Sequence, residues 1–407
     1  KVMAVTDKAP LAGIKVLDLS RVLAGPWASQ TLADLGADVI KVERPGVGDD
    51  TRSWGPPWHT DAQGEQLSAY FIAANRGKRS VTIDMATTEG QALVRDLAQR
   101  SDILIENFKV GDMQRRGLDY ASLQGLNPRL IYCSITGFGQ TGPYKERPGY
   151  DFMIQGMSGL MSITGEPDAK SNDGPQKVGV AVADVLTGLY ATIAILAAVQ
   201  ERQRSGLGQS IDMSLFDVMA ASLANQASNY LVSGVAPDRL GNSHPNVVPY
   251  QTFATLDGYI IVAVGNDSQF RKLSAAIGKP SLGEDPLYLS NALRVAHRES
   301  LVVEIQACMV NQSMDQWLKI LESAGVPCGP INTIDRLFAD PQTRERGTQL
   351  DLDGMPLVAN PIKYSRSEIN YSIKPAVLGV DTDRVLESAL GLDQATIEAL
   401  RAQGIVG

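Results

Sequence analysis

The chain has 407 residues, of which 44% are hydrophobic and 20% are charged, and its formal net charge is −8. This composition is that of an ordinary globular protein and excludes a disordered or fibrous chain. At roughly 100–200 residues per domain, the length predicts two domains. The negative charge disfavours nonspecific binding to polyanions, so we expect no nucleic-acid partner.

Cysteine and histidine are scarce, which limits the chemistry available to the chain. Cys133, Cys308 and Cys328 lie far apart, so they predict neither a disulfide framework nor a metal site. Three histidines make a multi-histidine metal centre or a histidine relay hard to build. We therefore expect no metal and favour carboxylate chemistry.

Apolar runs such as Leu189–Val199 are shorter than the roughly 20 residues that span a bilayer, and no signal segment opens the chain. We expect no membrane partner and a cytoplasmic location, or an organellar matrix in a eukaryote.

The first part of the chain alternates between predicted strands and helices. Strand Lys15–Leu19, helix Pro26–Leu35 and strand Asp38–Glu43 form a β-α-β unit. The pattern continues with strand Ser80–Asp84, helix Glu89–Arg100, strand Asp102–Glu106, a short helix near Tyr120–Gly125 and strand Leu130–Ile135. This alternation predicts an α/β fold with a parallel sheet, whose ligands bind at the carboxyl ends of the strands.

Three common ligand or nucleophile motifs are missing from this α/β region. The first turn, Ser20–Pro26, lacks the glycine spacing that brings backbone close to a dinucleotide pyrophosphate. There is also no phosphate-binding P-loop and no nucleophile elbow of the G-x-S-x-G type. Nicotinamide oxidoreductases, kinases and α/β-hydrolases are therefore disfavoured.

A change of pattern near Asn225 predicts a second, smaller α+β domain over residues 225–328. Strands Tyr250–Ala254 and Tyr259–Gly265 flank the turn Leu256–Gly258, a strong hairpin signal. Predicted helices follow over Gln269–Ile277, Ala292–Asn311 and Met314–Ala324. The segment Gly325–Pro330, rich in glycine and proline, is typical of a linker.

Asp184 is the sharpest candidate for chemistry. Gln176–Ala183 predicts a strand of small residues, and Asp184 follows it at the start of an apolar helix from Val185 to about Arg204. A carboxylate there can accept backbone N–H bonds and meets the positive end of the helix dipole, which favours its ionised form. It could act as a nucleophile. Aspartate is also a favoured helix cap, and local chemistry alone favours the capping role.

Two further groups of residues are candidates for binding. A long loop follows the strand that ends near Ile135 and leads to Tyr150 and Asp151, its most reactive-looking members. Arginines near strand ends could bind phosphates, although each alone is more often a solvated surface charge. They are Arg21, Arg44, Arg52, Arg76, Arg79, Arg115 and Arg116.

Short segments spread along the chain point to one family. They are Leu11–Leu19, Ala24–Pro26, Leu35–Glu43, Glu106–Phe108, Gly137–Pro143, Val182–Asp184, Gly241–Pro245, Gly325–Pro330 and Leu378–Gly379. In this order they resemble the class III CoA-transferases, the CaiB/BaiF family. The resemblance implies a large Rossmann-like domain from both chain ends, 1–224 and 329–407, a small domain at 225–328, and an interlocked homodimer.

The resemblance also implies a mechanism and a set of site residues. Asp184 corresponds to the family's nucleophile, which forms a mixed anhydride and then an aspartyl-CoA thioester. CoA contacts are implied at Val22, Leu23, Arg44, Ile83, Asn107, Phe108 and Arg115. Acyl-CoA and small carboxylic acids are the implied partners, so a CoA thioester is a substrate and no tightly bound cofactor is expected.

The family also contains α-methylacyl-CoA racemases, which use a histidine in a Gly-His-Asp motif. The matching residues here are Gly149, Tyr150 and Asp151, and Tyr150 is the second candidate catalytic residue. Because a tyrosine with a pKa of about 10 is a poor base at neutral pH, transfer is favoured over racemisation.

Segments such as Thr51–Pro57 and Val248–Gln251 are most similar to the succinyl-CoA:glutarate type of CoA-transferase. This similarity implies dicarboxylate substrates, for which Arg21, Arg147, Gly241 and His244 are the candidate contacts. The alternatives are an acyl-CoA racemase or epimerase and a non-catalytic CoA-binding protein.

Overall fold

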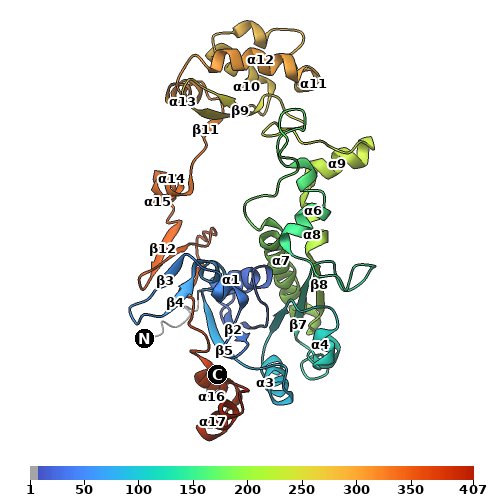
Figure 1. The fold of residues 1–407 in the computed structure, drawn as a ribbon, viewed down its shortest axis with the longest axis vertical. Helices are drawn as coiled ribbons and strands as arrows, with labels where there is room; N and C mark the ends of the chain where they lie inside the picture. The colour runs from blue at the N-terminus through green and yellow to red at the C-terminus, as the bar shows by residue number, and fades with distance from the viewer. Residues whose placement is uncertain (1–7) are drawn as a thin grey trace. The chain divides into compact units, whose positions relative to one another are not determined.

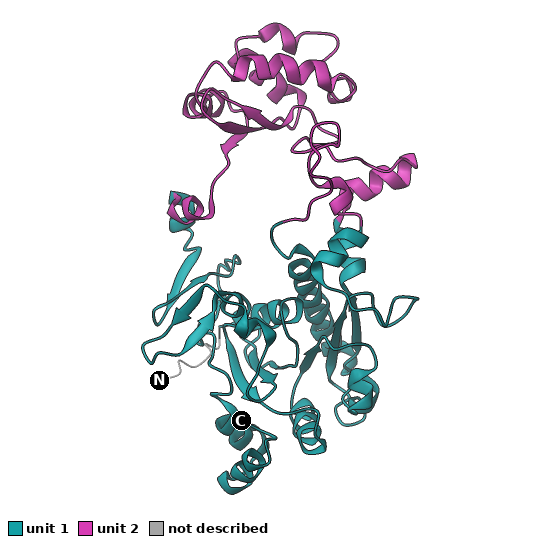
Figure 2. Ribbon diagram, viewed as in Figure 1, with its two compact units in different colours: residues 1–158, 179–222, 341–407 teal, residues 159–178, 223–340 magenta. Residues whose placement is uncertain are grey.

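The structure, a computed structural model, describes residues 8–407. It divides into two compact units (Figure 2). Unit 1 consists of Lys1–Ser158, Gly179–Ser222 and Pro341–Gly407, and unit 2 of Gly159–Val178 and Leu223–Asp340. The sequence-based bounds, 1–224 with 329–407 and 225–328, differ from these chiefly by assigning residues 159–178 and 329–340 to the large domain.

Unit 1 is built on a six-stranded parallel sheet (Figure 1). Its strands lie in the order β5 (Lys78–Thr82), β2 (Asp38–Glu43), β1 (Lys15–Asp18), β6 (Ile103–Glu106), β7 (Ile131–Thr136) and β8 (Ser210–Ser214). The chain winds outward from β1 in one direction and then returns to β6 on the other side of β1. The α/β, Rossmann-like prediction is confirmed, and the strand order reverses between β1 and β6.

Helices from both ends of the chain contribute to unit 1. They are α1 (Ala24–Asp34), α2 (Ala69–Ala74), α3 (Thr88–Gln99), α4 (Asp112–Arg115), α5 (Tyr120–Leu123), α6 (Asp151–Met157), α7 (Val182–Ser205), α8 (Leu215–Ser222), α15 (Pro341–Glu345), α16 (Thr382–Leu390) and α17 (Gln394–Ala402). One core cluster joins sheet residues such as Leu17 and Val81 to Val94 of α3, Val385 of α16 and Ile397 of α17. The C-terminal helices therefore complete the core that the N-terminal strands begin.

Two antiparallel hairpins that the sequence did not predict also belong to unit 1. The first pairs β3 (Trp58–Thr60) with β4 (Gln66–Ser68), and the second pairs β12 (Gln349–Leu352) with β13 (Met355–Val358). Side chains of both hairpins and of α2 pack in one small core of Leu67, Phe71, Ile72, Met355 and Leu357. Strands of three or four residues are too short to produce a clear alternation in sequence.

Unit 2 has a three-stranded antiparallel sheet of β9 (Tyr250–Ala254), β10 (Tyr259–Ala263) and β11 (Cys328–Pro330). Its helices are α9 (Ala224–Ser233), α10 (Asp267–Ala276), α11 (Asn291–Ala296), α12 (Arg298–Met309), α13 (Met314–Ser323) and α14 (Ile334–Ala339). The predicted hairpin is confirmed by the pairing of Tyr259 with Ala254. The single helix predicted over Ala292–Asn311 is two helices, which meet at His297.

The segment before Asp184 differs from its prediction. Residues 176–181 form bends and irregular backbone rather than a strand, and α7 begins at Val182. The predicted strand Gln176–Ala183 is therefore wrong. Its alternation of valine with small residues suits a strand, but the sheet of unit 1 ends at β8 and gives this segment no neighbour.

Helix α7 is longer than the apolar run seen in the sequence. It has 24 residues, and an 18-residue window within it has a mean hydropathy of 2.0. By length and composition alone the helix could cross a membrane, although 39% of that window is buried inside the protein. In the fold it packs against α1: a Cβ on Gly188 would meet the Ala24 carbonyl oxygen at 2.7 Å and the Trp27 Cβ at 2.9 Å. The expectation of no membrane partner stays a prediction.

Substitution of Gly188 tests this helix contact. Gly188→Ala places a methyl group against the α1 backbone, and we expect it to lower the free energy of unfolding by about 1–3 kcal/mol although alanine favours helix. Urea denaturation measures the change. Gly125→Ala is the control, because a Cβ on Gly125 meets nothing within 4 Å. Equal stability of the two variants would contradict the tight contact.

Candidate active site

The loops after β1 and β6 meet where the strand order reverses. The side-chain oxygen of Asn107 accepts the Arg21 N–H at 2.9 Å, and its amide nitrogen donates to the Arg21 carbonyl at 2.8 Å. Arg21, Val22 and Leu23 follow β1, and Asn107 and Phe108 follow β6. Open α/β sheets bind ligands outside the carboxyl ends of their strands at such a reversal. The structure thus brings five of the sequence-predicted residues together there.

Buried charges hold the loop after β1 in a strained conformation. Val22 has a φ of 67°, which is unusual for a β-branched residue. Its N–H donates to both carboxylate oxygens of Asp49, at 3.1 and 3.2 Å. The Lys41 Nζ donates to Asp49 at 2.9 Å and to the Ser20 carbonyl at 2.8 Å. Burial alone would raise the pKa of Asp49, but Lys41 and the Thr51 hydrogen bonds lower it to about 2.

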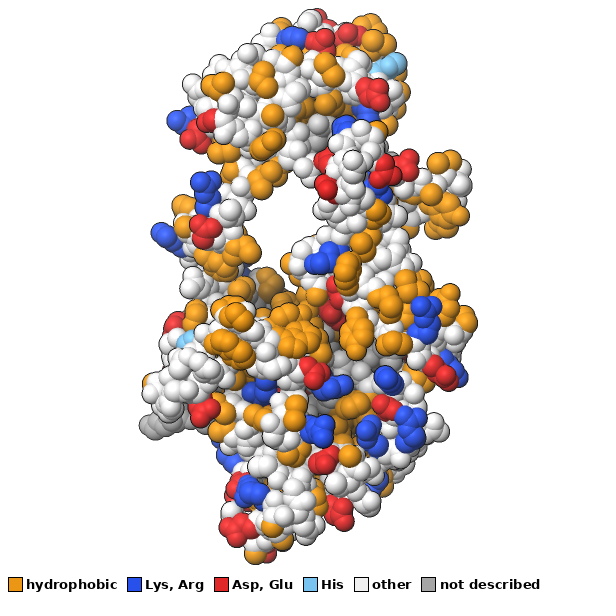
Figure 3. Space-filling model, viewed as in Figure 1, with side chains coloured by type: hydrophobic (Ala, Val, Ile, Leu, Met, Phe, Trp, Pro, Cys, Tyr) orange, Lys and Arg blue, Asp and Glu red, His pale blue; other side chains and the backbone are white. Residues whose placement is uncertain are grey.

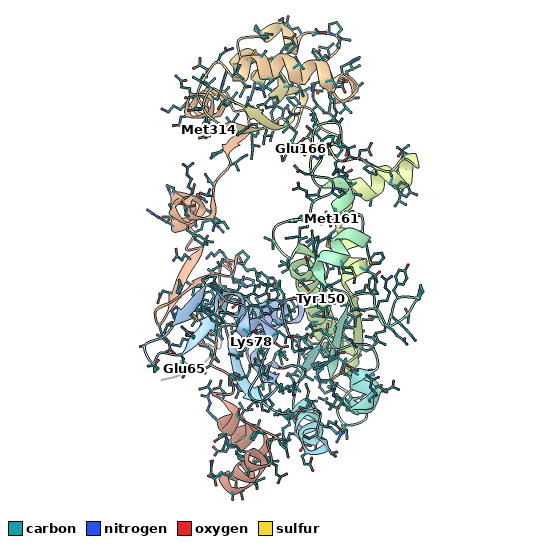
Figure 4. All side chains as sticks on the ribbon, viewed as in Figure 1. Glu65, Lys78, Tyr150, Met161, Glu166 and Met314 are labelled. Atoms are coloured by element: carbon teal, nitrogen blue, oxygen red, sulfur yellow. The ribbon has the colours of Figure 1, made fainter. Side chains whose placement is uncertain are left out.

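A second buried pair supports the same loop from the sheet. The Asp18 carboxylate accepts the Ser20 N–H at 2.9 Å and the Lys78 Nζ at 3.2 Å. Lys78, labelled in Figure 4, also donates to the Pro26 carbonyl at 3.0 Å. Burial lowers the pKa of Lys78 to about 7, although Asp18 opposes this shift. Gly25 is required at the start of α1 because a Cβ there would lie 2.3 Å from the Ser20 Cβ.

Several arginines surround Phe108 and the neighbouring strand ends. The guanidinium groups of Arg21 and Arg116 lie 5.9 and 5.4 Å from the centre of the Phe108 ring. Arg44 is exposed after β2, and Arg115 is exposed at the end of α4, where it pairs with Asp112. Several Lys and Arg side chains lie close together on the face of unit 1 shown in Figure 3. Such a basic region suits a phosphorylated ligand.

The other predicted contacts lie elsewhere. Ile83 is 1% exposed and belongs to the core, so only its backbone could contact a ligand. Arg147 stacks on Tyr144 and Phe138, 4.6 and 5.6 Å from the ring centres.

Gly241 and His244 belong to unit 2. Gly241 has a φ of 57°, and a Cβ there would meet the Glu166 carboxylate at 2.4 Å. The His244 Nδ1 accepts the Asn246 N–H at 3.0 Å, and its ring lies 5.2 Å from that of Tyr250. These two residues are thus placed within a loop of unit 2 that Glu166 and Tyr250 also line.

Asp184 is the third residue of α7 and does not cap it. Ala181 is the N-cap residue before the helix, and its side chain makes no capping hydrogen bond. Instead the Asp151 carboxylate accepts the N–H groups of Ala183 and Asp184, at 2.7 and 3.3 Å. Burial, and then the charge of Asp151, raises the pKa of Asp184 to about 7. The expectation that the helix start keeps Asp184 ionised is therefore wrong: the helix acts on Asp151 and leaves Asp184 with a raised pKa.

Tyr150 and Tyr70 differ in their exposure and in their relation to Asp184 and Asp151. Tyr150, labelled in Figure 4, precedes α6 and is 74% exposed. Tyr70 on α2 is half-buried, and burial together with the charges of Asp184, Asp151 and Asp49 raises its pKa. Sequence reasoning missed Tyr70, because nothing in a six-residue helix without a motif indicates that its phenol lies near Asp184. Among residues 8–407, no group of three or more His, Cys, Asp or Glu side chains is arranged to hold a metal.

Comparison with known proteins identifies the family of this chain. CoA-transferase family III matches residues 11–382. This chain belongs to CoA-transferase family III. The succinate–glutarate CoA-transferase of Agrobacterium fabrum is 52% identical over 93% of this chain and 95% of its own length. The succinyl-CoA:glutarate CoA-transferase of Homo sapiens is 40% identical over 98% of this chain and 90% of its own length.

Solved structures support the same assignment. A CaiB/BaiF family protein from Brucella suis is 52% identical, with a TM-score of 0.83 over 94% of this chain and all of its own. A hypothetical protein from Mycobacterium tuberculosis is 29% identical, with a TM-score of 0.81 over 92% of this chain and 98% of its own. This member of family III is a CoA-transferase, so its substrates are an acyl-CoA thioester and a carboxylic acid.

Loss of the buried charge that holds Val22 should affect both stability and binding. Asp49→Asn leaves Lys41 buried without its anionic partner, and we expect unfolding to become easier by about 3–5 kcal/mol. The Kd for CoA should rise as the Ser20–Leu23 loop loosens. Thermal denaturation and calorimetric titration measure these effects. Asp38→Asn removes only a half-exposed pair with Arg79 and is the control; an equal loss there would refute the special role of Asp49.

The raised pKa of Asp184 predicts how stability depends on pH. Because the pKa of about 7 exceeds the ordinary value of 3.8, the ionised form is less stable in the folded chain than in the unfolded one. Stability is therefore lost as pH rises from about 4 to about 7. We expect Asp184→Asn to match the wild type near pH 4 and to exceed it by about 1–3 kcal/mol at pH 8 in urea denaturation. If the variant is less stable than the wild type at pH 8, the surroundings of Asp184 do not raise its pKa.

Proposed function

We propose that this enzyme transfers CoA from succinyl-CoA to glutarate or another short dicarboxylate through covalent intermediates on Asp184. The observation that carries the chemistry is the Asp184 carboxylate itself. It is partly buried, accepts no hydrogen bond among the described residues and has a pKa raised to about 7. The choice of acids rests on the identities of 52% and 40% to transferases that are named for succinate or succinyl-CoA and glutarate.

In the first half of the reaction, the ionised Asp184 attacks the thioester carbonyl of succinyl-CoA. A C–O bond forms, the C–S bond breaks, and a mixed anhydride and the CoA thiolate result. The thiolate then attacks the aspartyl carbonyl, which releases succinate and leaves an aspartyl-CoA thioester. Covalent catalysis of this kind replaces one difficult exchange between two acids by easier acyl transfers.

In the second half, the acceptor carboxylate attacks the aspartyl-CoA thioester and forms a new anhydride. The CoA thiolate attacks the acceptor's acyl carbon, and Asp184 leaves as a free carboxylate. No electrons are exchanged and no proton need be removed from carbon. Exclusion of water matters at each anhydride, since hydrolysis would waste the activated acyl group.

The contacts at the strand reversal support a place for CoA. In this proposal the backbone at Val22 and Leu23 and the side chains of Asn107 and Phe108 contact the ligand, while Arg44 and Arg115 bind its phosphates. The distal carboxylate of each dicarboxylate needs a cation, for which Arg21 is the first candidate. Arg21 is half-exposed beside Asn107 and pairs with Asp50 at 3.1 Å.

An interlocked homodimer is part of the same proposal. Large apolar side chains are exposed on the single chain, among them Leu231 at 79%, Val232 at 89% and Ile193 at 61%. A contact with a second copy would cover such surfaces. Light scattering coupled to size exclusion should give twice the chain mass of 43.7 kDa.

Mass spectrometry of the enzyme tests the proposed nucleophile. After incubation with succinyl-CoA and trapping with hydroxylamine, we expect the modification on the peptide that contains Asp184. Asp184→Ala should lower CoA transfer from succinyl-CoA to glutarate by at least about 1000-fold, because the variant lacks the carboxylate on which the acyl intermediate forms. Asp217→Ala, at the first turn of α8, is the control.

Full transfer activity in Asp184→Ala would refute the proposal. Incorporation of deuterium at the α-carbon of a branched acyl-CoA, with no second acid present, would instead support a racemase. A comparison of glutarate with other dicarboxylic acids as acceptors then defines the acyl substrate.

A further inference from the structure

Helix α7 is capped from outside by a side chain of another helix. Ala181 precedes the helix and has no side-chain oxygen, yet two of the N–H groups at its start have an acceptor. That acceptor is the Asp151 Oδ1, at 2.7 Å from the Ala183 nitrogen and 3.3 Å from the Asp184 nitrogen. Asp151 is the first residue of α6, so the cap comes from a different element.

The orientation of Asp151 is fixed by a second contact. Its Oδ2 accepts the Gln155 side-chain N–H at 2.7 Å, and Gln155 is fully buried one turn further along α6. The two oxygens of Asp151 therefore have different hydrogen-bond partners: one accepts N–H groups at the start of α7, and the other accepts the side-chain N–H of Gln155 within α6. This division leaves Asp151 little freedom to rotate.

An acidic side chain at the third position of a helix commonly turns back to bond the free N–H groups at the helix start. Asp184 occupies that position in α7 but its carboxylate makes no such bond in the described part of the chain. Asp151 instead accepts the N–H groups of Ala183 and Asp184, the two that an N-cap side chain would bind and that Ala181 cannot. Its negative charge also opposes rotation of Asp184 toward the helix start.

We propose that Asp151 is a positioning residue of the transfer reaction: it supplies the cap that Ala181 lacks at the start of α7 and holds the backbone of Asp184, whose carboxylate stays free to attack the thioester. This inference rests on the proposed function, in which Asp184 is the nucleophile. It assigns Asp151, rather than its exposed neighbour Tyr150, to the reaction.

The charge of Asp151 has a second effect on the nucleophile. Among the described residues, the charge that raises the pKa of Asp184 is that of Asp151 on α6, and the charge of Asp184 in turn raises the pKa of the Tyr70 phenol on α2. A carboxylate beside another carboxylate holds its proton more tightly and is the more basic nucleophile once ionised. Both effects of Asp151 thus increase the reactivity of Asp184 at pH values above 7.

The pH dependence of kcat/KM for succinyl-CoA separates the two roles of Asp151, because it reports the ionisation of the free enzyme. Asp151→Asn keeps an oxygen for the α7 N–H groups but removes the charge. We expect the acidic midpoint of its profile to lie about one pH unit below that of the wild type. Asp151→Ala also removes the cap, and kcat/KM at pH 8 should fall by about 10–100-fold while KM changes less than kcat.

Asp217→Asn is the matched control, since it removes an acidic group from the first turn of α8. Its midpoint should equal that of the wild type. If Asp151→Ala folds normally by circular dichroism and keeps the wild-type kcat/KM at pH 8, the positioning role is refuted. If Asp151→Ala does not fold, a wild-type midpoint for Asp151→Asn refutes the part of the role that depends on the charge of Asp151.

Peptide mapping distinguishes this inference from the proposed function. An adduct on Asp184 in the wild type together with wild-type kcat/KM in a folded Asp151→Ala would refute only the role of Asp151. Absence of any adduct on Asp184 would refute the nucleophile itself.

Discussion

The buried ion pair between Lys41 and Asp49 fixes the backbone on which the ligand site depends. Lys41 comes from β2 and Asp49 from the loop after it, yet together they bind the carbonyl of Ser20 and the N–H of Val22 in the loop after β1. Removing two charges from water is costly, and the pair is stable only because the remaining polar groups are also hydrogen-bonded. The left-handed backbone of Val22 is one of the strained features that these bonds maintain.

Carboxylates in unit 1 show how environment separates their roles. Asp18 and Asp49 are buried beside lysines, and those charges hold the pKa of each below its usual range. Asp184 is partly buried with another carboxylate as its charged neighbour, and its pKa is raised. The same type of side chain therefore has a lowered pKa in two places and a raised pKa in the third, as its neighbours dictate.

Much of the fold was predictable from sequence, and the reason is periodicity. The strands β1, β2, β6 and β7 and the helices α1 and α3 have apolar patterns that match their burial, so their predicted bounds lie within about two residues of those observed. Family resemblance predicted Val22 and Asn107 as CoA contacts by position, and this stays a prediction. Local sequence could not show that Arg21 and Asn107 are hydrogen-bonded, because the two residues lie far apart in the chain.

The failures have physical causes as well. Val178–Ala183 has the alternation of a strand but no neighbouring strand to pair with, and pairing is not encoded locally. Asp184 was taken for the cap because aspartate is favoured at helix starts, whereas the acceptor comes from Asp151 on another helix. Tyr70 affects this site only through tertiary proximity, which no spacing in sequence records.

The close approach of α1 and α7 at Gly188 links two parts of the candidate site that are distant in the chain. Helix α1 begins at the end of the loop that follows β1, and α7 begins two residues before Asp184. Because a Cβ on Gly188 would meet the Ala24 carbonyl oxygen and the Trp27 Cβ, glycine lets the two helices pack closely here, and this packing sets the spacing between the loop after β1 and Asp184. The surrounding loops can therefore change in sequence while this spacing is kept.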